Sequence, residues 1–533
     1  MIREQLAAAV RQALVDEGVP DVEVHLERPA RLEHGDWSTN VALASAKRAG
    51  RNPRELAAAI VARLESAGVP HLREVEIAGP GFINFRLAPS WLHEVLTDVV
   101  ERGTEAFGAS EPGSGHHICV EMISANPTGP LHAGHARGAC YADALANILT
   151  RTGNRVQREY YINDRGTQLD VFARSLAAVR AGEPIPEDGY GGEYILEWGA
   201  EMPPGADPLE WGYQRALAEI RGGLERLGIH MDHWFSERSM AETGAIEQTL
   251  ADLRERGVVY DAEGAVWLRS TDFGDDKDRV LVKSDGEYTY ILPDIAYHRD
   301  KFGRGFDLLI DVFGADHHGY VTRLKAGVAA LGHDPDELEV RITQIVRLER
   351  EGEEVKLSKR TGELIELTAM IDEVGADATR FTYLLQSIDS QQTVDLAVIA
   401  ANTMDNPVFY VQMAHARACS IQRKAASEGI ATRPLGEVDL SVLTGERELA
   451  VLRSLSEFDE VIAMAARERA PHKVTTWVRE LAAAFHGFFH DRYVVGEGIP
   501  PEVTQARLWL VEAARVGLAV GLGVLGVGAP EKL

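Results

Sequence analysis

The sequence predicts an α/β protein with a parallel sheet covered by helices at its centre and a smaller domain on each side. Three observations predict it. Short apolar strands alternate with helical stretches over residues 116–395, a smaller mixture of strands and helices occupies residues 1–110, and residues 396–533 are almost entirely helical in pattern. The length of 533 residues suits three or four domains of ordinary size.

The N-terminal region has the pattern of a small α+β domain. A helix is expected in "NPRELAAAIVARLESAG", where Asn52 can cap the N-terminus, Pro53 takes the first helical position and Gly68 follows the end. The stretch "VEVHLERP" predicts a strand before this helix. The stretch "VEIAGPGFINFRL" predicts a strand after it, interrupted by a Gly-Pro-Gly turn.

The central region carries the βα rhythm of a parallel sheet, with strands expected in "HHICVEMIS", "VQREYYI", "FDLLIDVFGAD" and "EVRITQIVRLER". Residues from about 175 to 260 interrupt this rhythm, and their Gly, Pro and helical stretches predict an inserted helical subdomain. Apolar residues at intervals of three and four then predict a helical bundle over residues 396–533.

Composition narrows the class of protein. No run of about 18 apolar residues exists, so no membrane-spanning helix is expected. The N-terminal "MIREQLAAAVRQALVDEG" lacks the basic start and apolar block of a signal peptide, so a cytoplasmic protein is expected. Cys119, Cys140 and Cys419 are odd in number and far apart, which favours buried thiols over disulfides. The net charge of −27 counts against non-specific nucleic-acid binding, but a local basic face remains compatible with it.

Residues 124–153, "SANPTGPLHAGHARGACYADALANILTRTG", pass from a strand through a Pro-Gly turn into a helix that begins around Ala133. The ligand crevice of an open parallel sheet lies at the carboxyl ends of its strands, where a helix N-terminus favours an anion. His132 and His135 lie one helical turn apart and can donate to phosphate oxygens, while Gly134 leaves the backbone open to a flat base. The alternative is a helix cap with incidental histidines.

The HxGH pattern of this stretch resembles the HIGH signature of class I aminoacyl-tRNA synthetases. Downstream, "VKLSKRTGE" places Lys356, Ser358 and Lys359 in a pattern similar to KMSKS, the second signature of that class, with Arg360 at its last position. Ammonium groups suit the departure of pyrophosphate because they stabilise the negative charge that accumulates in the transition state. A lone KxSK is typical of a solvated basic loop, but its order and distance after HxGH favour the second signature.

Further stretches resemble arginyl-tRNA synthetases in particular: "REYYINDRGTQ", "DRVLVKSDGEYTYILPDIAYH", "VFGADHHGYVTRLKA", "NPVFYVQMAHAR", "GVGAPEKL" and, near the start, "HGDWSTNVALASAK" and "IAGPGFINF". The resemblance covers nearly the whole chain in order. It implies an additional N-terminal α+β domain (1–110) that contacts the tRNA elbow, a Rossmann-like class I catalytic domain (116–395, with the insertion at about 175–260) and an all-helical anticodon-binding domain (396–533). The implied reaction converts arginine and ATP to arginyl-adenylate and pyrophosphate, and then transfers arginine to the terminal ribose of tRNA(Arg) with release of AMP.

The resemblance also implies the residues of the nucleotide site. The catalytic residues are expected to be His132, His135, Lys356 and Lys359. The other ATP-binding residues are expected to be Asn126, Pro127, Thr128, Gly129, Pro130, Leu131, Gly134, Gly314, Asp316, His317 and Ser358. ATP is expected as its Mg²⁺ complex, held mostly through the nucleotide phosphates. No protein-bound zinc is expected, because the adjacent His317 and His318 have no third ligand at a suitable spacing.

By similarity, Asp294 and Tyr290 hold the guanidinium group of L-arginine, and Glu121 and Asn126 hold the rest of the amino acid. A guanidinium group suits planar carboxylates, but the sequence leaves open which carboxylate takes the guanidinium and which the α-ammonium group. Glu121 can instead be a surface charge at a strand end, and Asp294 can be the N-cap of the helix that follows it.

By similarity, Tyr410, Gln412 and Arg417 contact the tRNA, because aromatic and basic groups together suit unstacked anticodon bases. The alternative is a bundle helix with a solvated basic face. A monomer is expected. The sequence reads Lys-Leu at its last two positions, where the family often has Arg-Met, so anticodon binding through a terminal Met is not expected.

Two other functions remain in view. A small-molecule ligase such as a pantothenate–β-alanine ligase also carries HxGH, but it leaves the helical C-terminal region unexplained. A non-catalytic synthetase paralogue is expected to have broken ATP signatures, and both signatures are intact here.

Overall fold

The computed structural model describes residues 2–29, 31–111, 113, 115–355 and 365–533. The chain forms two compact units. Unit 1 comprises Met1–Glu101, Lys424–Ser456 and Gly487–Ala513, and unit 2 comprises Arg102–Arg423, Glu457–His486 and Ala514–Leu533. Four helices contribute residues to both units: α4 (Ser90–Ala106), α16 (Pro407–Ser427), α19 (His472–Asp491) and α20 (Pro501–Val524).

Unit 1 contains a three-stranded antiparallel sheet in the order β1-β3-β2, formed by β1 (Trp37–Thr39), β2 (Leu72–Ala78) and β3 (Phe82–Leu87). Among the residues that the structure describes, the α-helices wholly within this unit are α1 (Ile2–Asp16), α2 (Val41–Ala49), α3 (Pro53–Ala67) and α17 (Glu446–Ser456). The predicted start of α3 is confirmed, because the Asn52 side chain accepts from the Arg54 N–H at 2.9 Å. The predicted end is confirmed too, with Gly68 in the left-handed conformation at φ 62°.

The strand predicted in "VEVHLERP" is wrong. Its only ladder contact among the described residues is a single bridge, in which Glu27 and Ser38 exchange two backbone hydrogen bonds of 2.9 and 2.8 Å. The alternating apolar residues Val24 and Leu26 are buried. The alternation of apolar residues therefore indicates which side chains face the core. A strand forms only if a neighbouring strand of matching length also pairs with it.

Unit 2 is built on a five-stranded parallel sheet in the order β11-β10-β4-β5-β6. Its strands are β4 (His117–Met122), β5 (Arg155–Ile162), β6 (His233–Ser236), β10 (Leu308–Gly314) and β11 (Leu338–Thr343). From β4 the sheet grows in two opposite directions, through β5 and β6 on one side and through β10 and β11 on the other. The carboxyl end of β4 therefore lies at the switch point where such sheets bind ligands. The α/β fold class with a parallel core is confirmed.

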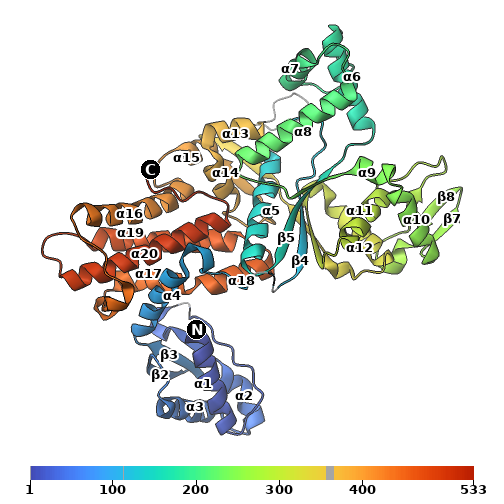
Figure 1. Cartoon of the computed structure of the whole chain (residues 1–533). Coiled ribbons are helices and arrows are strands. Elements are labelled where there is room, and N and C mark those ends of the chain that lie inside the picture. Colours follow the sequence, from blue (N-terminus) through green and yellow to red (C-terminus); the bar gives the residue numbers. More distant parts are fainter. Residues whose placement is uncertain (1, 30, 112, 114, 356–364) are drawn as a thin grey trace. The chain divides into compact units, whose positions relative to one another are not determined.

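Helices cover both faces of this sheet (Figure 1). Helix α5 (Ala133–Arg151) lies on one face, where Gly138 packs so closely that an added Cβ would stand 3.3 Å from Thr343 and 3.8 Å from Val312. Side chains alternate between faces along a strand, so Asp311, the neighbour of Val312, points to the opposite face. On that face lie α11 (Ile291–Gly303) and α12 (Val321–Ala330) (Figure 1).

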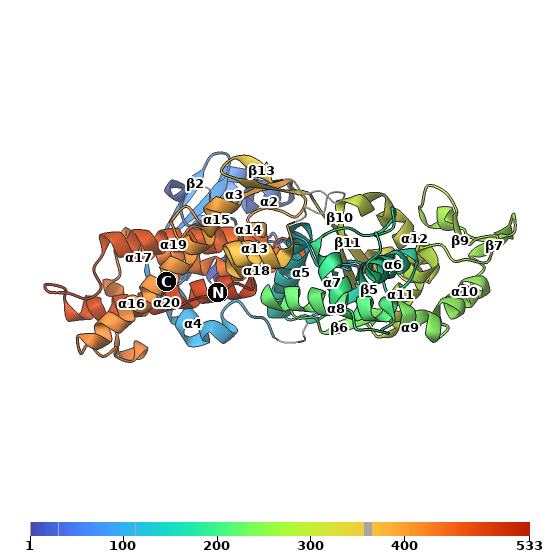
Figure 2. The same ribbon diagram turned by 90° about the horizontal axis from the view of Figure 1, so that it is seen from above.

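The insertion between β5 and β6 is helical, as expected, and consists of α6 (Thr167–Ala181), α7 (Glu193–Glu201) and α8 (Pro208–Arg226). The predicted bounds of the insertion, residues 175–260, differ from the structure. The first inserted helix begins earlier, at Thr167, and the predicted range also contains β6, which pairs with β5 in the central sheet, and the start of a further strand at Val259. Beyond α9 (Glu237–Glu242) and α10 (Ala245–Glu255), a small antiparallel sheet of β7 (Val259–Ala262), β8 (Ala265–Leu268) and β9 (Arg279–Val282) lies beside α10 (Figures 1 and 2).

The stretch "EVRITQIVRLER", predicted as a strand of the central sheet, contains two strands in different sheets. After β11, the chain continues as β12 (Val346–Arg350), which pairs with β13 (Glu353–Val355) and β14 (Gln392–Asp395). The remaining helices of unit 2 are α13 (Leu367–Val374), α14 (Ala376–Tyr383), α15 (Leu396–Ala400) and α18 (Phe458–Glu468). The helical C-terminal pattern is confirmed by α16–α20.

Buried charge joins several of these elements within unit 2. Arg380 is 1% exposed and donates to the carbonyls of Leu227 at 3.1 Å and Leu525 at 3.2 Å, and to the buried carboxylate of Asp143. The three cysteines are buried thiols, as predicted. Within the described ranges, every helix is too short or too polar to cross a membrane.

Candidate active site

The chain leaves β4 through a strained turn. Ile123 and Ser124 both have positive φ, 73° and 43°, a conformation that costs about 1–3 kcal/mol per non-glycine residue. This conformation turns the Ser124 hydroxyl back onto Glu121, to which it donates at 2.8 Å. Glu121 is 4% exposed, so the alternative of a surface charge at a strand end is wrong. Its other carboxylate oxygen accepts from Lys301 at 2.6 Å, a partner that sequence reasoning missed.

The HxGH turn begins α5 as predicted. His132 is the N-cap residue, and its backbone N–H donates to Nδ1 of His135 at 3.3 Å. The two imidazoles stack with ring centroids 3.6 Å apart. Because Nδ1 of His135 accepts, Nε2 carries the proton of the neutral ring and can donate to an anion. An added Cβ on exposed Gly134 would stand 2.9 Å from Nδ1 of His132, so a larger residue at this position would displace the His132 ring.

The turn between β4 and α5 packs against the helical insertion. Tyr194 of α7 donates to the carbonyl of Thr128 at 3.1 Å, and its ring leaves no room for a Cβ on Gly129. Asn126 hydrogen-bonds to Gln168 near the start of α6. Pro127, Thr128 and Leu131 are buried. The predicted ATP-binding turn thus has a packed base formed by α6 and α7.

A second segment is hydrogen-bonded directly to the HxGH turn. Ala133 N–H donates to the Ile365 carbonyl at 2.9 Å, Leu367 N–H donates to the Leu131 carbonyl at 2.8 Å, and His132 and Glu366 form an antiparallel bridge. These residues follow "VKLSKRTGE" in the chain. Lys356, Ser358 and Lys359 lie outside the described residues. The residues that follow them in the chain, Ile365–Leu367, are hydrogen-bonded to the HxGH turn.

The residues predicted for the adenosine side follow the neighbouring strand. Gly314 ends β10, which pairs with β4, so both segments lie at the carboxyl edge of the sheet. Residues Ala315–Tyr320 form a short 3-10 helix there. His317 is exposed, and its ring lies 5.4 Å from that of Phe313. The side chain of Asp316 is outside the described part of the structure.

The two residues predicted at the start of α11 have different surroundings. Asp294 is half-buried in the first turn and accepts from the Tyr320 phenol; burial raises the pKa of Asp294, and this hydrogen bond opposes the rise. Tyr290 is 86% exposed and occupies the N-cap position. The alternative that Asp294 is the N-cap is therefore wrong. Tyr320 is a partner of Asp294 that no sequence pattern indicated.

Sequence reasoning also missed Glu237. It is the first residue of α9, whose start is held by Asp164: this carboxylate accepts from Ser236 Oγ at 2.6 Å and from Arg238 N–H at 2.8 Å. Burial, together with the negative charge of Asp294, raises the pKa of Glu237 to about 7 although Arg165 opposes the rise. Glu237 lies in the stretch "HWFSERS", which carries no recognisable motif.

Tyr161 of β5 links the acidic residues of the site. Its phenol hydrogen-bonds to Glu237, and burial together with the charges of Glu237, Asp294 and Glu121 raises its pKa far above the ordinary value. Three carboxylates from three different elements therefore act electrostatically on one phenol. A region of this kind has a negative potential that favours a cationic ligand.

The predicted tRNA-binding residues lie on α16. The ring of Tyr410 stands edge-on to that of His486, 4.6 Å away, and His486 also accepts from Arg417 at 2.9 Å. Gln412 is 7% exposed, and its amide donates within the protein, to Asp377 at 2.7 Å and to the Gly528 carbonyl at 2.9 Å. Tyr410 and Arg417 thus belong to one cluster, whereas Gln412 packs inward.

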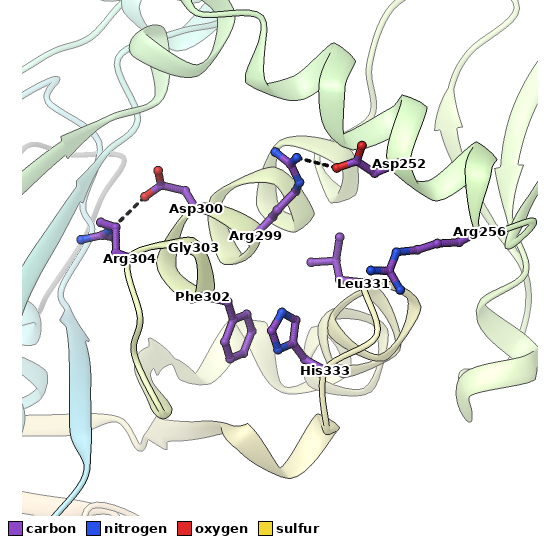
Figure 3. A pocket seen from close by; sticks show the side chains of 9 residues that line it. All are labelled: Asp252, Arg256, Arg299, Asp300, Phe302, Gly303, Arg304, Leu331 and His333. Atoms are coloured by element: carbon purple, nitrogen blue, oxygen red, sulfur yellow. Dashed lines mark ion pairs between the residues drawn. The ribbon is translucent and has the colours of Figure 1, made fainter.

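A hollow of about 550 Å³ lies elsewhere in unit 2, where the C-terminal ends of α10, α11 and α12 meet (Figure 3). It contains none of the predicted site residues and lies at the opposite end of α11 from Asp294. Two of its charged side chains, Arg299 and Asp252, form an ion pair with each other. The rings of Phe302 and His333 stack with their centroids 3.8 Å apart. The chemistry of the predicted site therefore lies at the sheet edge and not in this hollow.

Three family profiles match the chain. The arginyl tRNA synthetase N terminal domain matches residues 1–87, the catalytic domain of class I tRNA synthetases (R) matches residues 223–420, and the DALR anticodon binding domain matches residues 411–533. The catalytic match begins after HxGH and includes Glu237, Asp294 and the segment that carries Lys356 and Lys359.

Similar proteins agree over the full length. The chain is 44% identical to arginine–tRNA ligase 1 of Halalkalibacterium halodurans, covering 100% of this chain and 98% of that one. It is 43% identical to the arginine–tRNA ligase of Staphylococcus aureus strain JH9, covering 99% and 98% respectively. The fold matches that of Thermus thermophilus arginyl-tRNA synthetase with a TM-score of 0.79 at 23% identity, covering 100% of both chains. The chain therefore belongs to the arginine–tRNA ligases, the class I aminoacyl-tRNA synthetases specific for arginine.

Proposed function

We propose that this chain activates arginine at the carboxyl edge of the five-stranded sheet and transfers it to tRNA(Arg). The observation that carries the proposal is the pairing of Leu131–Ala133 with Ile365–Leu367. Lys359 lies six residues before Ile365, and six residues of chain reach at most about 20 Å. Both signatures can therefore serve the same triphosphate.

The nucleotide enters as MgATP, and the protein positions it. The Nε2 proton of His135 and the N-terminal dipole of α5 favour phosphate oxygens beside the HxGH turn. The ammonium groups of Lys356 and Lys359 stabilise the charge that accumulates on the departing pyrophosphate. The carboxylate of arginine attacks the α-phosphorus and the bond to the pyrophosphate oxygen breaks, so no protein nucleophile is required.

The carboxylates around Tyr161 select arginine. Asp294 and Glu237 accept the guanidinium group, while Glu121 and Asn126 hold the amino-acid end. This assignment rests on their positions: Asp294 and Glu237 act on each other electrostatically, and Glu121 lies at the strand end next to the HxGH turn. A neutral amino acid brings no cation to Asp294 and Glu237, which is a basis for discrimination.

In the second step a hydroxyl of the terminal ribose of the tRNA attacks the acyl carbon of arginyl-adenylate, and AMP leaves. The cluster of Tyr410, His486 and Arg417 contacts anticodon bases by stacking and by charge. We infer that the enzyme acts in the cytoplasm, where its tRNA substrate is made available for protein synthesis. A single chain supplies every residue named here, and light scattering with and without tRNA tests the inferred monomer.

The experiment is ATP–pyrophosphate exchange with each amino acid, with and without tRNA(Arg). Exchange is expected with arginine and is expected to require the tRNA. Asp294→Asn is expected to raise the KM for arginine without changing that for ATP. Asp300→Asn, a carboxylate at the other end of α11, is the matched control and is expected to change neither. Exchange with a different amino acid, or with none in either condition, would overturn the proposal.

A further inference from the structure

Three carboxylates stand in one row across the middle of the parallel sheet. Asp311 on β10 is in register with Glu121 on β4, and Glu121 is in register with Glu159 on β5. Residues in register on adjacent strands point to the same face, so the three side chains lie side by side beneath α11. They are 0%, 4% and 0% exposed, which requires partners for each charge.

Helix α11 and its C-cap residue, Arg304, supply those partners. Lys301 is 0% exposed and donates to Glu121 at 2.6 Å and to Asp311 at 2.9 Å. One turn further along, Arg304 donates to both oxygens of Glu159, at 2.6 and 2.8 Å. Although desolvation opposes it, the charges of Asp311 and Glu121 raise the pKa of Lys301, so the ammonium form is retained.

His298 connects the row of carboxylates to Asp294, which is proposed to accept the guanidinium group. Its Nε2 lies 2.8 Å from Asp311 and its Nδ1 lies 2.7 Å from the backbone carbonyl of Asp294. The carbonyl can only accept, so Nδ1 donates, and the second contact needs a proton on either Nε2 or Asp311. Asp294, His298 and Lys301 are spaced by four and three residues and therefore share one face of α11.

We propose that Lys301 is a positioning residue that sets the separation of Glu121 from Asp294, and thereby the length of cationic side chain that the enzyme accepts. The ammonium group clamps α11 to β4 and β10 at once, and α11 carries Asp294 seven residues, or about 10 Å, from Lys301. This inference rests on the proposed function, in which Glu121 and Asp294 hold opposite ends of arginine.

The test compares arginine with homoarginine, which is one methylene longer, in ATP–pyrophosphate exchange with tRNA present. The readout is the ratio of the homoarginine inhibition constant to the arginine KM. One methylene is worth a 10- to 200-fold discrimination in a well-shaped site. In Lys301→Met, which keeps the length of the side chain and removes its charge, the ratio is expected to fall at least fivefold, with the KM for ATP within twofold of the unsubstituted enzyme. Lys301→Arg, which restores a cation, is expected to recover part of the ratio.

The matched control is Arg304→Met, which removes the neighbouring cation of the same row. Its carboxylate partner, Glu159, has no part in holding arginine, so the ratio is expected to stay unchanged. If Lys301→Met does not fold, Asp311→Asn supplies the test, because it weakens the anchor of Lys301 while preserving the shape of the side chain. An unchanged ratio in the folded variant, or an equal change in Arg304→Met, would overturn the inference. If Glu121→Gln leaves the arginine KM unchanged, the proposed role of Glu121 itself fails.

Discussion

Lowering the pH from 8 to 6 is expected to weaken arginine binding through Glu237. Burial and the charge of Asp294 raise the pKa of Glu237 to about 7. A bound guanidinium favours the ionised carboxylate and lowers this pKa again, so arginine binding releases a proton. The sign follows: arginine affinity rises with pH through the pKa of the free enzyme and is lost as the carboxyl group becomes protonated below it.

The magnitude follows from the ionised fraction. With a pKa of about 7, the ionised fraction of Glu237 is about 0.9 at pH 8 and about 0.1 at pH 6, so the apparent arginine affinity changes about tenfold, or about 1.4 kcal/mol. Asp294 acts in the same direction, because its pKa is also raised by burial. The net effect is an arginine KM about tenfold higher at pH 6 than at pH 8.

The assay is steady-state exchange at saturating ATP and tRNA between pH 6 and 8.5, with kcat/KM for arginine plotted against pH. The profile of kcat/KM reports the pKa values of the free enzyme. Calorimetry in two buffers of different ionisation enthalpy counts the protons released. Glu237→Gln is the control and is expected to raise the KM and to flatten the profile near pH 7. A KM that is constant over this range, or that falls at low pH, refutes the reasoning.

Three other variants test the site and the fold. His135→Ala removes the Nε2 donor beside the phosphates and is expected to lower kcat by about 10²-fold with little change in thermal stability; an unaltered rate contradicts its role. Gly134→Ala places a Cβ 2.9 Å from Nδ1 of His132, so the KM for ATP is expected to rise while the KM for arginine stays constant, and equal effects on both would count against local crowding. Arg380→Met leaves a buried aspartate without this partner and is expected to lower the free energy of unfolding by about 3–5 kcal/mol, measured by urea denaturation; a loss below about 1 kcal/mol would show that the pair contributes little.

Local patterns in the sequence predicted those parts of the site that neighbouring residues build. The start of α5 and the strand that precedes it were predicted because periodicity changes from two to three or four within a few residues. The start of α3 was predicted from Asn52, whose side chain accepts from backbone two residues away, and from Pro53, whose ring fixes its own φ. The strand expected in "VEVHLERP" failed because strand formation depends on a partner that is distant in sequence.

The residues that sequence reasoning missed share a different property. Glu237 and Lys301 lie outside the stretches that carry the family resemblance, and Tyr320 lies in "VFGADHHGYVTRLKA" without any sign there of its partner. Each acts on a residue from another element: Glu237 on Asp294 and Tyr161, Tyr320 on Asp294, and Lys301 on Glu121. Their pKa shifts and pairings arise from burial, which depends on how the sheet and α11 pack together and which no local pattern encodes.

The sequence by itself determined the class of the protein, the order of its elements and the two signatures, because turn chemistry, helix caps and periodicity act over a few neighbouring residues. Only the tertiary structure decided that Asp311, Glu121 and Glu159 stand in one row beneath α11. It also decided that the residues after "VKLSKRTGE" are hydrogen-bonded to the HxGH turn. The physical reason is that strand register and burial are set by packing between distant segments, and an ionisable group acquires its charge and its partner from that packing.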